Sequence, residues 1–154
     1  MVRALVFLVA FSMVTAATTQ DASNCTLTMS GAHAASVPCT VHVGSERGRN
    51  VTAVTIDGDG AHFVVRLRGN ATVARFASND AVSGAALGVH TAGGAYWFYN
   101  REVGGVGKPA AGGYELELAA VTNDARATPS GTLTARLPSG SVGGGILTVT
   151  ARFQ

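Results

Sequence analysis

Apolar and polar residues alternate along most of this chain with a period of two. Residues 61–68 place Phe63, Val65 and Leu67 on one side, as a half-buried strand does. The other side carries the polar residues His62, Arg66 and Arg68. The strands predicted by this pattern cover residues 25–29, 37–43, 51–56, 61–68, 71–77, 87–91, 95–99, 114–121, 132–137 and 147–153. Residues 81–86 are all small or β-branched, and we expect a loop or one helical turn there.

Turn residues separate these segments. Residues 57–60 read Asp-Gly-Asp-Gly, which predicts a hairpin because glycine accepts the positive φ of a tight turn. Residues 100–113 contain five glycines and predict a long loop. Many short strands with turn chemistry between them predict an all-β fold, an antiparallel β-sandwich of roughly 8–10 strands, with a small β-barrel as the alternative.

The first 17 residues have the character of a secretory signal peptide. Arg3 precedes an apolar run that ends in small residues, with cleavage expected after Ala16 or Ala17. The run is shorter than the roughly 17–20 residues that a membrane-spanning helix needs. We therefore expect one β-sandwich domain at 18–154, with no membrane span, in a secreted, periplasmic or extracellular protein.

Composition narrows the function further. The formal net charge is only +2 and the basic residues are scattered along the 154-residue chain. Nucleic-acid-binding proteins usually gather such residues on one face, so we expect no nucleic-acid partner.

Cys25 and Cys39 are the only cysteines. A lipid-anchor cysteine would follow the apolar leader directly, and a structural zinc site would need four ligands. In the alternating pattern both thiols face the same side of a predicted hairpin, and export favours oxidation. The sequence predicts a disulfide, which would contribute about 3 kcal/mol by closing a 15-residue loop in the unfolded chain.

Residues 96–99 hold four aromatic side chains in succession: Tyr96, Trp97, Phe98 and Tyr99. On a strand only one alternate pair can enter a single core. The other pair is either covered by the loop at 100–113 or forms a binding surface for sugar or protein, because such rings tolerate both burial and water. In the ligand-binding interpretation we assign the contacts to Trp97 and Tyr99, and consider all four residues candidate ligand-binding residues.

Known catalytic and metal-binding motifs are missing from the sequence. The histidines at positions 33, 42, 62 and 90 form no short metal-binding spacing, and no nucleophile elbow or phosphate loop is present. We expect no catalytic residue, no metal and no cofactor, and therefore a non-catalytic structural or binding module of the cell envelope or exterior. One alternative is a barrel that carries an apolar ligand in a cavity lined by Phe63, Val65, Leu116 and Leu118. A second is a hydrolase or metalloenzyme, which would need a convergent cluster of histidines and carboxylates.

Four segments resemble a loose group of exported bacterial β-rich proteins, often lipoproteins, of unassigned function. The similar segments are residues 24–31 with 39–41, 114–118, 131–138 and 147–153. The resemblance implies an exported β-rich domain and assigns no catalytic residue. This chain differs from many of that group because it lacks a lipid-anchor cysteine.

Overall fold

The computed structural model describes residues 20–21, 24–45, 51–69, 74–80, 82–101, 112–120, 128–141 and 144–154. The expected signal peptide at 1–17 and most of the expected loop at 100–113 lie outside these residues. The described residues form strands and turns, with no helix among them. The strands are β1 (Gln20–Asp21), β2 (Cys25–Gly31), β3 (Ala35–Ser45), β4 (Val51–Gly58), β5 (Ala61–Arg68), β6 (Ala74–Ala77), β7 (Ser83–His90), β8 (Tyr96–Arg101), β9 (Gly113–Ala120), β10 (Ser130–Pro138) and β11 (Ile146–Phe153).

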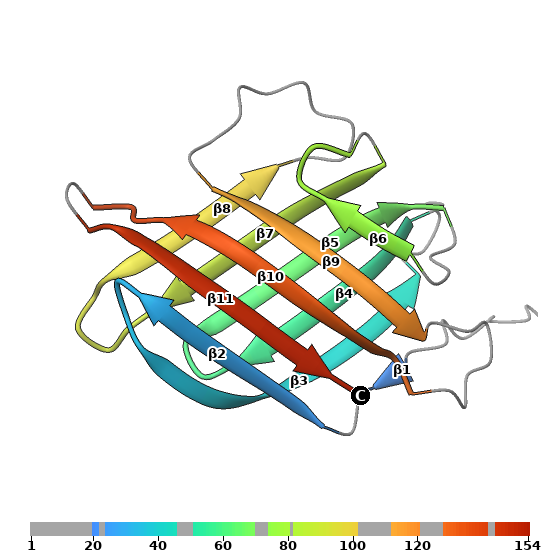
Figure 1. Cartoon of the computed structure of the whole chain (residues 1–154), viewed down its shortest axis with the longest axis horizontal. Coiled ribbons are helices and arrows are strands. Elements are labelled where there is room, and N and C mark those ends of the chain that lie inside the picture. Colours follow the sequence, from blue (N-terminus) through green and yellow to red (C-terminus); the bar gives the residue numbers. More distant parts are fainter. Residues whose placement is uncertain are drawn as a thin grey trace, which may run out of the picture.

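These strands form one antiparallel sheet that curls into a half-barrel. Its strand order is β6-β9-β10-β11-β2-β3-β4-β5-β7-β8, with β1 paired to β3 beside this path. The sheet folds over so that β9, β10, β11 and β2 lie across β4, β5 and β7 (Figure 1). The all-β prediction is confirmed. The single continuous sheet fits the barrel alternative better than the two separate sheets of the predicted sandwich.

Strand β3 belongs to both layers. It pairs with β2 through residues 35–38 and with β4 through residues 39–45. Pro38 is the last residue of the first ladder, opposite Thr26, and it has no N–H to donate to a further bond. At the next position Cys39 bonds to Cys25, with 4.9 Å between the two Cα atoms. The predicted disulfide is confirmed, and it lies where β3 changes neighbours.

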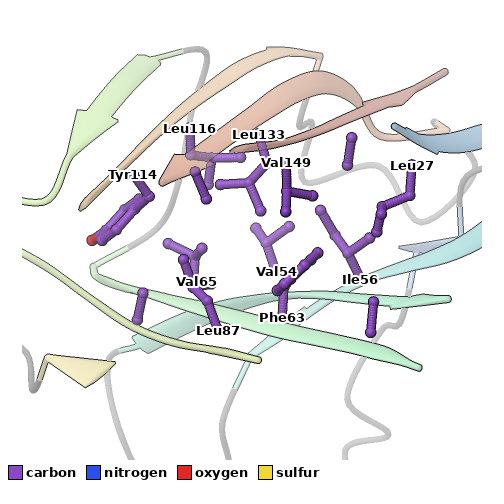
Figure 2. Close-up of a cluster of buried hydrophobic side chains, with 14 of the residues drawn as sticks. Leu27, Val54, Ile56, Phe63, Val65, Leu87, Tyr114, Leu116, Leu133 and Val149 are labelled. Carbon is purple, nitrogen blue, oxygen red and sulfur yellow. The ribbon is translucent and has the colours of Figure 1, made fainter. Parts of the chain in front are cut away.

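The core lies between the two layers (Figure 2). The alternation predicted for residues 61–68 is confirmed, because Phe63, Val65 and Leu67 are buried and His62 is exposed. Both layers contribute to the largest fully buried side chains, which are Leu27, Val41, Val54, Ile56, Phe63, Val65, Leu67, Leu116, Leu118, Leu133, Leu137 and Leu147. Burial of this continuous apolar face is the main force that holds the layers together.

Strand β11 pairs with β2, which brings residues 24 and 154 together. Phe153 lies opposite Cys25, and Asn24 and Gln154 exchange two backbone hydrogen bonds of 3.0 and 3.1 Å. At the other end of β2, Gly31 lies opposite Leu147. The residues that flank the sheet at 24 and 154 are therefore neighbours at one end of the half-barrel.

One local expectation is wrong. Residues 83–90 form strand β7 instead of a loop or helical turn at 81–86, because small side chains such as Ala85 fit the inner face opposite Val65.

The outer side of β9 carries two carboxylates. Strand register sets Glu115 and Glu117 opposite Thr134 and Thr132 of β10, respectively. Glu115 forms an ion pair with Arg75 on the neighbouring β6 at 2.7 Å.

Candidate functional site

The aromatic strand predicted at 95–99 is β8, and its alternation divides the four rings between two environments. Trp97 and Tyr99 are buried, with 5% and 6% of their surface exposed. Tyr96 and Phe98 are 37% and 51% exposed. The expectation that Trp97 and Tyr99 contact a ligand is therefore corrected, because the pair available to a ligand is Tyr96 and Phe98.

Trp97 and Tyr99 have structural partners instead. The Trp97 ring stacks on His33 with 6.2 Å between centroids, and its Nε1 donates to the Gly144 carbonyl at 3.4 Å. Trp97 also forms an isolated bridge with Ser139, which links the edge of β8 to the end of β10. Tyr99 meets Tyr114 edge to face at 5.9 Å. These contacts explain why this pair points inward: it joins β8 to the opposite layer.

The outer side of β4, β5, β7 and β8 carries a row of residues that strand register sets side by side. Asp57 lies opposite His62, His62 opposite Gly88, and Gly88 opposite Phe98. The His62 Nδ1 and Asp57 Oδ1 atoms are 2.5 Å apart, and both side chains are open to solvent. We call this row, together with Tyr96 and His90 at the end of β7, the aromatic face.

Gly88 makes the centre of the aromatic face flat. A Cβ atom built on Gly88 would find its nearest neighbour, the His62 carbonyl oxygen, at 4.0 Å. Since strands lie about 4.8 Å apart, Phe98 and His62 flank an open strip about two strand spacings wide. A ligand resting there would contact an aromatic ring on one side and an imidazole–carboxylate pair on the other.

The exposed rings are held in a fixed arrangement along β8. Tyr96 and Phe98 have centroids 6.0 Å apart and planes within 17° of each other. The Tyr96 ring also stacks on His90, with 6.1 Å between the ring centroids. The Tyr96 hydroxyl donates a hydrogen bond to the Gly140 carbonyl at 3.1 Å. Three near-parallel rings therefore follow one another from the end of β7 along the edge strand.

A pocket of about 500 Å³ opens at the end of the half-barrel next to these rings. Its floor is apolar, and its rim carries polar side chains from three separate turns. We call it the mouth pocket, and its described lining consists of Met29, His33, Ala35, Val37, Asp59, Gly60, Val89, His90, Thr91 and Ala92. His90 belongs to both features, because it lines the mouth pocket and stacks on Tyr96.

Gly60 brings the rim of the mouth pocket together. Its φ is +67°, and a Cβ atom at this position would lie 2.3 Å from the His90 carbonyl oxygen. The close approach allows the His90 N–H to donate to the Gly60 carbonyl at 2.7 Å. The predicted hairpin at 57–60 is confirmed, with Asp59 and Gly60 between β4 and β5, and it holds Asp59 beside the end of β7.

The cavity expected for an apolar carrier is not where the sequence placed it. Phe63, Val65, Leu116 and Leu118 are at most 1% exposed and belong to the core cluster. They line neither the mouth pocket nor a second hollow of about 740 Å³ on the outer side of β2, β10 and β11. That hollow has a mixed polar and apolar lining, to which threonines contribute.

Within the described residues, no three histidine, cysteine or carboxylate side chains come together in a way that could hold a metal ion. The same part of the chain has no helix with the length and apolar character of a membrane span. Comparison with protein-family models, curated proteins and solved structures finds no match. The resemblance to exported bacterial β-rich proteins therefore stays a prediction.

Proposed function

We propose that this protein is an exported, non-catalytic binding domain that contacts carbohydrate through the aromatic face. The observation that carries the proposal is Phe98, a large apolar ring that is 51% exposed, beside the open strip above Gly88. Exposing such a ring to water has a cost that a monomeric protein normally avoids, so clustered exposed aromatics mark interaction surfaces.

Carbohydrate fits both halves of the aromatic face. One side of a sugar ring presents C–H groups, which pack against an aromatic ring and remove its surface from water. The sugar hydroxyls need hydrogen-bond partners at the same time. The His62–Asp57 pair offers them, because a carboxylate accepts and an imidazole donates or accepts according to its tautomer.

Export is supported by two independent features. The Cys25–Cys39 disulfide is typical of proteins that leave the reducing cytosol. The sequence at 1–17 predicts the leader that would direct such a route.

The test is a glycan-array screen of the purified protein, followed by calorimetry with the best soluble oligosaccharide. We expect Phe98→Ala to weaken binding about two- to tenfold, since stacking of this kind contributes about 0.5–1.5 kcal/mol. Gly88→Val is the sharper variant. Its side chain enters open space, so the fold stays intact while the strip between Phe98 and His62 is filled.

Val82→Ala is the matched control, because Val82 is 45% exposed and lies in the turn before β7, away from the aromatic face. It should bind as the unmodified protein does. Glycan binding that survives both Phe98→Ala and Gly88→Val would overturn the proposal. The proposal would also be overturned if the purified protein bound no glycan but captured a protein partner, and if both variants lost that partner.

A further inference from the structure

The mouth pocket has the properties of a small-molecule site that is separate from the aromatic face. Its volume of about 500 Å³ lies within the range of ligand pockets, about 300–1,000 Å³. Met29 and Val89 form an apolar floor and are themselves 5% and 1% exposed. A few polar side chains above an apolar floor are the usual composition of such sites.

The charges of the rim select the kind of ligand. Asp59 is the only carboxylate among the described lining residues, and none of them is a lysine or arginine. His33, His90 and Thr91 add neutral hydrogen-bonding groups. A ligand with an ammonium group would therefore meet an opposite charge without a competing cation, whereas a carboxylate ligand would be repelled by Asp59.

Contacts within the chain hold the rim of the mouth pocket. His33 stacks on the buried Trp97 at 6.2 Å, and the Thr91 N–H donates to the Ala95 carbonyl at 2.9 Å. Gly60 and His90 are tied by their 2.7 Å backbone bond. A site whose walls are held in this way loses little conformational freedom on binding.

From these observations we infer that the mouth pocket binds a small organic amine with an apolar body, the body resting on Met29 and Val89 and the ammonium group beside Asp59. The inference goes beyond carbohydrate binding and does not depend on it, because the two sites share only His90. The apolar ligand that the sequence placed in a core cavity would thus bind at the open end of the half-barrel instead.

The test uses three ligands with one aromatic body and different head groups: 2-phenylethylamine, 2-phenylethanol and 3-phenylpropionate. Binding is followed by amide NMR shifts in the full protein. We expect the amine to bind most tightly and to shift the amide signals of residues 59–60 and 90–92. Its affinity should exceed that of the alcohol by about fivefold, the size of one solvent-exposed ion pair.

Two variants separate charge from shape. Asp59→Asn should remove the preference for the amine and leave alcohol binding unchanged. Ala92→Leu, at an exposed turn position on the rim, should weaken all three ligands by narrowing the opening. Glu117→Gln is the matched control, since it removes the same charge from the outer side of β9.

Equal binding of amine and carboxylate would overturn the inference, as would shifts confined to residues outside the lining. An amine preference that persists in Asp59→Asn would overturn it as well. Glycan binding is measured independently of this series, so either site can fail while the other stands.

Discussion

The Tyr114 hydroxyl donates a 2.7 Å hydrogen bond to Ser83 Oγ, and this buried bond joins β9 in one layer to β7 in the other. Ser83 Oγ in turn donates to the Ala77 carbonyl at 2.9 Å. Both residues are shielded from water, with 3% and 0% of their surface exposed. These two bonds give both buried hydroxyl groups a partner, as buried polar groups require.

Removing either member of this bond should destabilise the fold by different amounts. Ser83→Ala leaves the Tyr114 hydroxyl buried without its acceptor, at a cost of about 1–3 kcal/mol. Tyr114→Phe removes the donor and leaves Ser83 its bond to Ala77, so we expect about 1 kcal/mol. Urea unfolding of both variants and of the double variant measures the coupling. Strictly additive effects would show that the bond does not tie the layers.

Alkaline pH should weaken the fold through the same tyrosine. Burial raises the pKa of the Tyr114 hydroxyl above its ordinary value near 10, and the bond to Ser83 opposes this only in part. The folded state thus disfavours the phenolate, while the unfolded state ionises freely. Stability is fully present below about pH 10 and falls as the pH rises toward the folded-state pKa. Unfolding free energies between about pH 9 and about pH 11 should decline more steeply in the unmodified protein than in Tyr114→Phe. Parallel declines would contradict this.

Loss of the disulfide should cost about 3 kcal/mol, because Cys25 and Cys39 close a short loop of the unfolded chain. The double variant Cys25→Ser with Cys39→Ser should unfold at lower urea, and reductant should shift the unmodified protein to the same midpoint. Reductant should leave the double variant unchanged. Alkylation followed by intact-mass measurement should find no free thiol before reduction, and a midpoint insensitive to reductant would refute the expectation.

Two glycines with positive φ provide a matched comparison. Gly60 and Gly94 have φ of +67° and +81°, but only Gly60 faces a close neighbour, the His90 carbonyl oxygen. Gly94→Ala should cost about 1–2 kcal/mol for the left-handed backbone alone. Gly60→Ala should cost more, since β4–β5 and β7 must separate, and it should also disturb the mouth pocket. Equal losses in thermal unfolding would show that the close approach is unimportant.

Period-two alternation and turn chemistry were enough to predict most strands, the hairpin at 57–60 and the disulfide, because each depends on local pattern or short sequence separation. The half-barrel was harder to predict from the sequence, since it depends on the change of pairing partner along β3, from β2 to β4 after Pro38. The pattern also divided the four aromatic residues correctly into two pairs. It could not decide which pair faces inward, because that depends on Trp97 reaching the β10–β11 turn, more than 40 residues away.

The remaining site residues carry weak sequence signals. His62 and Asp57 flank a hairpin and could have been recognised as cross-strand partners from the turn alone. Gly88 and Phe98 became neighbours only through the register of β7 with β8. Asp59 and His33 come from two turns and His90 from the end of β7, and their convergence follows from the curl of the whole sheet.

The pairing of β2 with β11 also gives the molecule an orientation. Asn24 and Gln154 lie together at the start of β2, whereas Met29 and His33, at the other end of the strand, line the mouth pocket. A surface or partner that held the protein by either flank would leave the open end pointing outward, away from the point of attachment. Fusion of a carrier after residue 154 should accordingly leave the mouth pocket accessible, which makes the domain suitable for immobilisation in a binding assay.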